Sequence, residues 1–162
     1  MVFVTVGNAR QGFSRLLGAV DALCGSGAFG EEPVLVQRGH TGGESLAHCQ
    51  SVDFLPSDEF ERHLDEASLV VCHGGTTQLS AIRLGKIPIV MPRLKRFGEH
   101  INDHQMQLVQ ALAAEGLVVP AYEPGDLAAA VTEARQRRGQ LVPPCAMVEL
   151  VTEALVQLGG HR

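Results

Sequence analysis

A buried strand that ends in a glycine turn and opens a helix is the feature that most constrains how this chain can fold. The pattern predicts a strand at Val70–Cys72, a tight turn at His73–Gly75 and a helix from Thr76 to about Gly85. The first N–H groups of a helix lack intrahelical partners, and the helix dipole is positive at that end, so such a turn favours anions. The turn therefore predicts a site for a ligand that carries phosphate.

The rest of the chain alternates apolar runs with helix-spaced apolar residues. The apolar runs predict strands at residues 2–6, 33–37, 51–55, 68–72, 87–91 and 117–119. Helices are predicted at residues 13–24, at 58–67 with Ser57 or Asp58 as N-cap, at 76–85, over a segment bearing Ile101, Leu108, Val109 and Leu112, at 126–138 and at 145–158. Strands that are apolar on both faces and alternate with helices predict a three-layer α/β domain with a parallel sheet.

Three loops are expected to meet at one edge of this sheet. In open parallel sheets, ligands bind beyond the carboxyl ends of the strands. The loops that follow strands there are residues 7–12, 73–77 and 92–105. We expect the functional site to be built from these three segments.

Composition narrows the range of functions. A chain of 162 residues fits a single domain, here taken as residues 1–162. Its net charge of −5 argues against a general role in binding nucleic acids, and its apolar runs are far shorter than the ~20 residues of a membrane span. The four cysteines show no C-x-x-C spacing and no signal peptide precedes the first strand, which favours reduced thiols in a cytoplasmic protein.

Two familiar motifs do not fit their context. Residues 25–30 match G-x-G-x-x-G, but they follow a helix and precede a strand, the reverse of a dinucleotide fingerprint, so NAD binding is disfavoured. His100 and His104 have the spacing of zinc ligands on a helix. The inverted metalloprotease motif has Glu where this chain has Asp103, and no third ligand follows, so we expect no metal.

Several segments in combination resemble glycosyltransferase family 28. They are the opening strand with its glycine at residues 2–7, the helix residues 13–21, the Cys72–Gly75 turn, the step from Leu84 to Lys86, the strand end at Pro92–Arg93, and the run Gly98–Gln105. More narrowly, they are similar to short members that form the donor-binding half of a split enzyme. Examples are the small subunit of the dolichol-linked N-acetylglucosaminyltransferase and subunits of the PssE type.

The resemblance implies a GT-B architecture, in which two Rossmann-like domains face each other across a cleft. This chain would be the half that holds the nucleotide-sugar. The family implies inverting transfer from a UDP-sugar to a polyprenyl-diphosphate-linked acceptor in polysaccharide synthesis, with no cofactor. It also implies a membrane-anchored partner that binds the acceptor, recruits this chain to the cytoplasmic face of the membrane and usually supplies the general base.

Residues in the three loops are the expected contacts to the donor. The set is Gly7, Asn8, His73, Gly74, Gly75, Thr76, Thr77, Arg93, Glu99, Asp103, His104 and Gln105. Backbone N–H groups at the turn and a cationic rim of Arg93, Lys95 and Arg96 would meet the charge on the leaving diphosphate. His100 and His104 are the candidates for a general base in this chain. The alternatives are a structural turn, a solvated basic loop, and helix capping by Asn102 and Asp103.

The helix after the turn departs from the family pattern. Many relatives have a glutamate there that holds the ribose hydroxyls, whereas this chain reads Gln78-Leu79-Ser80, so Gln78 or Ser80 is expected to replace it. The missing glutamate also supports a competing hypothesis, namely that the chain is a non-catalytic nucleotide- or phosphate-binding protein on a Rossmann-like scaffold.

Overall fold

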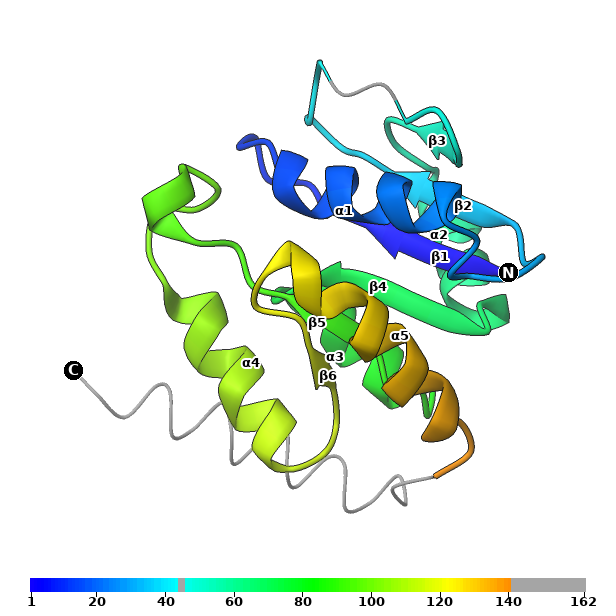
Figure 1. Ribbon diagram of the computed structural model, residues 1–162. Helices are drawn as coiled ribbons and strands as arrows, with labels where there is room; N and C mark the ends of the chain where they lie inside the picture. Colours follow the sequence, from blue (N-terminus) through cyan, green and yellow to red (C-terminus); the bar gives the residue numbers. More distant parts are fainter. Residues whose placement is uncertain (44–45, 141–162) are drawn as a thin grey trace.

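The computed structural model describes residues 1–43 and 46–140 and shows a sheet with helices on both sides (Figure 1). The N-terminal part contains β1 (Val2–Thr5), α1 (Ser14–Gly25), β2 (Val34–Gln37), β3 (Gln50–Val52), α2 (Ser57–Glu66) and β4 (Leu69–His73). The remainder contains α3 (Thr76–Arg83), β5 (Ile89–Met91), the 3-10 turn η1 (Lys95–Phe97), α4 (His104–Ala114), β6 (Val119–Pro120), η2 (Pro124–Asp126) and α5 (Leu127–Gln136). The helix predicted at 145–158, with Cys145, lies outside the described residues.

The sheet confirms the predicted fold class. Its six strands are ordered β3-β2-β1-β4-β5-β6, and all neighbouring strands are parallel. The order reverses between β1 and β4, which pair directly, with Thr5 opposite Cys72. This is the Rossmann-like arrangement, in which the reversal point opens a crevice at the carboxyl ends of the two strands.

Two apolar layers hold the helices to the sheet. Val2, Val4 and Val71 point to the face covered by α1 and α5, whereas Phe3, Val70 and Cys72 point to the face covered by α2, α3 and α4. This alternation follows from the two-residue period of a strand. Figure 1 shows α1 and α5 in front of the sheet and α2 and α3 behind it.

Three local predictions were wrong. Ile101 does not lie on a helix, since α4 begins only at His104 and the preceding loop turns at η1 and at Gly98, leaving Ile101 72% exposed. Neither Ser57 nor Asp58 caps α2, because Pro56, with its fixed φ, occupies the N-cap position. The last strand is Val119–Pro120 rather than 117–119, and a proline is tolerated there because β6 is an edge strand.

None of the helices in the described residues is both long enough and apolar enough to cross a membrane.

Candidate functional site

The imidazole of His73 fills the crevice where the strand order reverses. Gly7 lies in the loop after β1 and has a positive φ. A Cβ atom built on it would lie 2.4 Å from Cε1 of His73. A Cβ built on Gly75 would lie 2.3 Å from Nε2 of the same ring. Both glycines are therefore needed for the ring to lie where it does, and the ring joins the first loop to the turn after β4.

The environment keeps this imidazole neutral. Burial, together with the smaller effects of the charges of Arg93 and His100, lowers the pKa of His73 to about 4. Its buried Nδ1 atom has no hydrogen-bond partner within the described residues. His73 thus presents an uncharged ring with a polar atom that no other group uses.

The turn after β4 leaves the start of α3 uncapped. Gly75 is the N-cap residue and makes no side-chain cap hydrogen bond, while its own N–H donates to the His73 carbonyl at 2.8 Å. The N–H groups of Thr76, Thr77 and Gln78 belong to the first turn, where no intrahelical acceptor exists. This end of α3 can therefore accept an anion.

A cavity of about 320 Å³ opens at this point. It brings together five of the predicted donor-binding residues, namely Gly7, Asn8, His73, Thr76 and Thr77. Its other lining residues are Gln37, Leu55, Ser57, Phe60 and Glu61. The cavity thus joins the anion-accepting end of α3 to a wall made by α2 and the segment before it.

This second wall was missed by reasoning from the sequence. Phe60 and Glu61 belong to α2, which reads as an ordinary amphipathic surface helix, and no motif marks them. They reach the cavity only because α2 precedes β4, which pairs with β1. Gln37 also contributes, and its amide is held by Thr5 Oγ1 at 3.3 Å and by the Leu55 N–H at 3.0 Å.

Arg93 was predicted to lie at the rim, and this was wrong. Its side chain is fully buried. The guanidinium donates to the carbonyl oxygens of Val6 at 2.6 Å, Gln11 at 2.8 Å and Glu99 at 3.2 Å, and it lies 4.7 Å from the centre of the Phe13 ring. Burial lowers its pKa to about 10, an effect that the charge of Glu99 opposes. Hydrogen bonds to the carbonyls of the first loop thus stabilise Arg93 in the interior of the protein.

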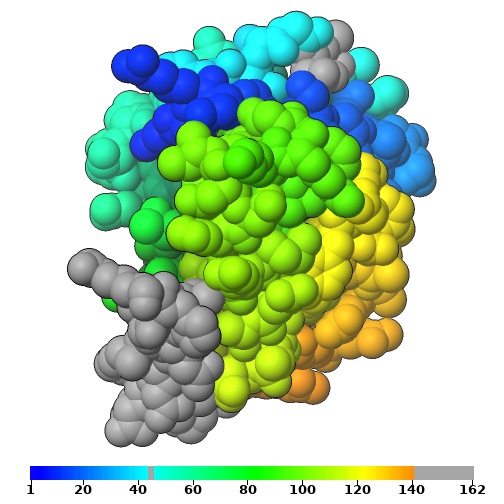
Figure 2. Space-filling view, turned by 90° about the vertical axis from the view of Figure 1, so that its left-hand side faces the viewer, coloured from blue at the N-terminus to red at the C-terminus, as the bar shows by residue number. Residues whose placement is uncertain are grey.

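Glu99 is buried beside Arg93 and is bound to Arg15. The Arg15 guanidinium donates to both carboxylate oxygens of Glu99, at 3.0 and 2.9 Å, and the Leu94 N–H donates to one of them at 2.9 Å. Arg15 also donates to the Pro92 and Tyr122 carbonyls, each at 2.7 Å. We call Arg15, Arg93 and Glu99 the arginine cluster. In Figure 2 the blue N-terminal segment lies directly against the green segment that this cluster ties to it.

Gln105 supports the glycine turn from behind. Its Oε1 accepts the Arg93 N–H at 3.1 Å, and a Cβ on Gly74 would lie 3.1 Å from the Gln105 Cβ. Gly74 therefore lets α4 approach β4 closely. Gln105 is buried and does not line the cavity.

The remaining predicted residues lie in the loop before α4 or at the first residue of α4, outside the lining of the cavity. Asp103 accepts the Lys95 N–H at 2.8 Å, and the Asn102 side chain accepts the His104 N–H at 3.2 Å. Nδ1 of His100 lies 3.0 Å from the Asn102 side-chain oxygen. Arg96 is exposed and pairs with Glu123 at 2.8 Å. The catalytic candidates, His100 in this loop and His104 at the first residue of α4, thus stay predictions.

Neither proposed replacement for the ribose glutamate reaches the cavity. Gln78 is fully buried, and both polar atoms of its side chain lack partners in the part of the chain that the structure describes. Ser80 Oγ donates weakly to the Thr76 carbonyl at 3.5 Å. Glu61 is the only carboxylate among the residues that line the cavity.

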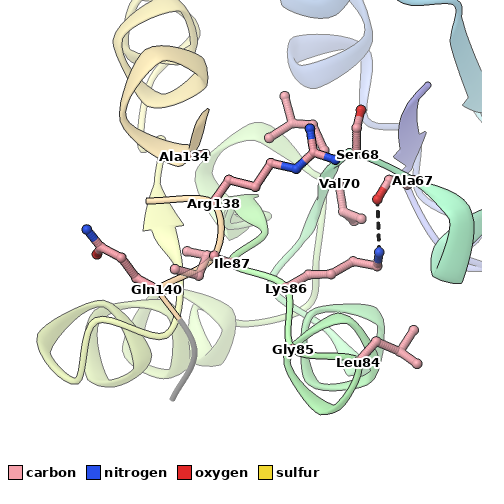
Figure 3. A pocket seen from close by; sticks show the side chains of 12 residues that line it. Ala67, Ser68, Val70, Leu84, Gly85, Lys86, Ile87, Ala134, Arg138 and Gln140 are labelled. Carbon is pink, nitrogen blue, oxygen red and sulfur yellow. Dashed lines mark hydrogen bonds between the residues drawn. The ribbon is translucent and has the colours of Figure 1, made fainter. Parts of the chain in front are cut away.

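The rest of the described chain offers no metal site and one smaller cavity at the other edge of the sheet. Residues 1–43 and 46–140 contain no group of three or more His, Cys, Asp or Glu side chains placed to hold a metal ion. A smaller cavity of about 180 Å³ lies at the opposite edge, where β4 begins, and Figure 3 shows Lys86 and Arg138 around it. Lys86 donates to the carbonyls of Asp65 and Ala67 there, at 2.6 and 2.9 Å, and so caps the C-terminal end of α2.

One solved structure agrees with this fold, and two others superpose less closely. The glycotransferase of kitacinnamycin superposes with a TM-score of 0.60 at 19% identity, over 99% of this chain and 39% of that one. SnogD from Streptomyces nogalater gives 0.48 at 22% identity, over 94% and 44%. EarP, from a study of arginine glycosylation of elongation factor EF-P, gives 0.47 at 19% identity, over 96% and 56%. The chain thus spans about two fifths to just over half of these structures.

The sheet order and the first of these likenesses define one Rossmann-like half of the GT-B type. The glycosyltransferase family 28 C-terminal domain matches residues 1–154, and the chain belongs to that family. A search of curated proteins gives no significant match.

Proposed function

We propose that this chain is the donor-binding half of an inverting glycosyltransferase and that its donor is a UDP-sugar. One observation carries the proposal: the cavity at the carboxyl ends of β1 and β4 is lined by Gly7, His73, Thr76 and Thr77 at the uncapped start of α3. A diphosphate placed there accepts hydrogen bonds from backbone N–H groups, and each charge-assisted hydrogen bond contributes roughly 1.5–3 kcal/mol. The same donors stabilise the charge that develops on the leaving UDP.

The wall formed by α2 provides a place for the nucleoside. Leu55 and Phe60 offer apolar surface to a base, and the Glu61 carboxylate can accept hydrogen bonds from the two ribose hydroxyls. Glu61 would then take the role of the glutamate that relatives carry on the helix after the glycine turn. This assignment rests on the proposed UDP-sugar site.

The acceptor belongs to a second half of the enzyme in this proposal. Phe97 and Ile101, in the loop between β5 and α4, expose apolar side chains that a second half can cover. We propose that a membrane-anchored partner supplies the acceptor-binding wall, the general base and the polyprenyl-diphosphate-linked acceptor. The chain covers 39% of the kitacinnamycin glycotransferase, the share expected of one half of such an enzyme.

Calorimetry with the purified chain tests the donor assignment. UDP and UDP-sugars are expected to bind, uridine to bind at least about tenfold more weakly because it lacks the phosphates, and ADP to bind more weakly than UDP. Equal or tighter binding of ADP would instead support the non-catalytic nucleotide binder. Absence of binding by every nucleotide would refute both.

Activity assays test the division of labour. Transfer from the UDP-sugar to a lipid-linked acceptor is expected only when the acceptor-binding partner is added. Full turnover by the chain without a partner would contradict the proposed arrangement.

A further inference from the structure

Two cysteine thiols lie together on the face of the molecule away from the candidate site. Cys24 is in the last turn of α1 and Cys49 directly precedes β3. Both are half-buried, both pack against the apolar layer under α1, and both line a cavity of about 330 Å³. Each of the two thiols also influences the pKa of the other, as expected of neighbouring side chains. The fold thus brings together two sulfur atoms that no sequence motif connects.

Asp21 and His48 fix the position of this pair. Asp21 Oδ1 accepts the His48 N–H at 2.9 Å and the Cys49 thiol at 3.6 Å, and Asp21 Oδ2 lies 3.2 Å from His48 Nδ1. The His48 ring packs on Gly25, where a Cβ atom would lie 3.2 Å from it. These contacts hold residues 48 and 49 against the end of α1. The two thiols can therefore meet without a large movement of the backbone.

We propose that Cys24 and Cys49 form a reversible disulfide bond and that the pair is a redox modification site of this protein. The oxidant is a low-molecular-weight disulfide such as oxidised glutathione. One cysteine thiolate attacks a sulfur of oxidised glutathione and expels a glutathione thiolate, which leaves a mixed disulfide. The second cysteine thiolate attacks the protein sulfur of that mixed disulfide and expels the other glutathione thiolate. Two protein thiols are oxidised, and two molecules of reduced glutathione are formed.

The environment of the two thiols slows this exchange, but formation of the disulfide remains favourable. Burial raises the pKa of both thiols, that of Cys49 to about 12, so the thiolate fraction at neutral pH is small. The neighbouring cavity admits the oxidant to both half-buried sulfurs. Because the two thiols already lie together, closing the bond costs little conformational entropy in the folded protein.

The bond would restrain a loop that touches the candidate site. The segment between the two cysteines contains β2 and the loop after it. In that loop, Thr41 Oγ1 accepts the Phe13 N–H at 3.0 Å, and a Cβ on Gly39 would lie 2.6 Å from the Gly7 carbonyl oxygen. Oxidation therefore restricts the conformations of the unfolded chain. In the folded protein it restrains the loop after β2, which supports the first loop.

The test compares the full-length chain after incubation with oxidised glutathione and with dithiothreitol. Peptide mapping by mass spectrometry is expected to show a Cys24–Cys49 cross-link, and the oxidised protein is expected to melt about 6 °C or more higher, reversibly. Cys24→Ser and Cys49→Ser should each abolish the shift, whereas Cys145→Ser should keep it.

Several outcomes would overturn the proposal. They are a cross-link that joins a different pair of cysteines, glutathione adducts without an internal cross-link, or the absence of any cross-link after incubation with oxidised glutathione. Because the mapping uses the natural sequence, a serine variant that fails to fold leaves the test decisive.

Discussion

The turn between β4 and α3 and the loop between β5 and α4 lie at the same edge of the sheet, yet they use their polar groups in opposite ways. In the turn, the start of α3 has no side-chain cap, and Nδ1 of His73 has no partner in the described residues. In the loop, Glu99 accepts from both Arg15 and the Leu94 N–H, and Arg93 donates to several backbone carbonyls. One region keeps its donors available, and the other uses them within the protein.

The difference separates a binding wall from its support. A group that already makes its hydrogen bonds inside the protein must break them before it binds a ligand. The arginine cluster therefore holds the first loop and the β5–α4 loop in place, while the turn and the wall of α2 are free to contact a donor. On this reading Arg93 is a positioning residue. Both regions are rich in the residue types expected for phosphate binding, so only their partners distinguish them.

The largest expected effect comes from replacing Arg93. Arg93→Met leaves the carbonyls of Val6, Gln11 and Glu99 without their donor in the interior. We expect the free energy of unfolding, measured with urea, to fall by about 3–5 kcal/mol. Arg96→Met is the matched control and should cost less than about 1 kcal/mol, because the Arg96–Glu123 pair is exposed.

The opposite result would reverse the assignment of the two regions. If Arg93→Met kept its stability but lost affinity for UDP, Arg93 would be a ligand of the donor after all. Arg93→Lys is informative as well, because a lysine cannot reproduce the branched donors of the guanidinium and should recover little of the stability.

The sequence was sufficient for the fold and for the edge of the sheet at which the candidate cavity lies. Strands that are apolar on both faces required a covered parallel sheet, and the glycine turn marked the edge at which ligands bind. Gly7 lies against His73 in the structure, so the first loop and the glycine turn meet as predicted. Periodicity and turn chemistry carry this information because they are local properties of the chain.

Two features could not be read from the sequence because they depend on distant contacts. A run of basic residues usually faces water, and the burial of Arg93 depends on carbonyls of Val6 and Gln11, which are far away along the chain. Glu61 lies on a helix with no motif, and it reaches the cavity only because β4 pairs with β1. Contacts between residues that are far apart along the chain are set by tertiary structure alone.

Acid should destabilise the turn through His73. Its pKa is about 4 in the folded protein and near 6.5 when unfolded, so the unfolded state binds more protons between these values. The stabilisation is present at neutral pH and is lost as the pH falls from about 6.5 towards 4. From pH 7 to pH 5 we expect the free energy of unfolding to fall by about 2 kcal/mol from this residue.

Urea unfolding at the two pH values measures this effect. His73→Asn should lose about 2 kcal/mol less than the natural protein over the same interval, whereas His104→Asn, which changes an exposed ring, should show the full loss. Equal losses in the natural protein and in His73→Asn would contradict the buried, neutral state of the ring.

A methyl group at Gly75 should affect binding more than folding. Gly75→Ala places a Cβ 2.3 Å from Nε2 of His73, so the ring or the turn must shift at the anion-accepting end of α3. We expect the affinity for UDP, measured by calorimetry, to fall about tenfold or more. Gly18→Ala is the control, since a Cβ there meets nothing within 4 Å and should leave the affinity unchanged. Unchanged affinity in Gly75→Ala would remove the turn from the site.

The smallest expected effect concerns Glu61 and separates the two parts of the binding wall. Glu61→Gln weakens hydrogen bonds to the ribose hydroxyls but leaves the start of α3 intact, so the affinity for UDP should fall about three- to fivefold. The affinity for 2′-deoxy-UDP should fall less, because one of the hydroxyls that the carboxylate would hold is already absent. Glu59→Gln, on the same helix but outside the lining of the cavity, should change neither value. Equal losses for both nucleotides would mean that Glu61 acts through charge and not through the ribose.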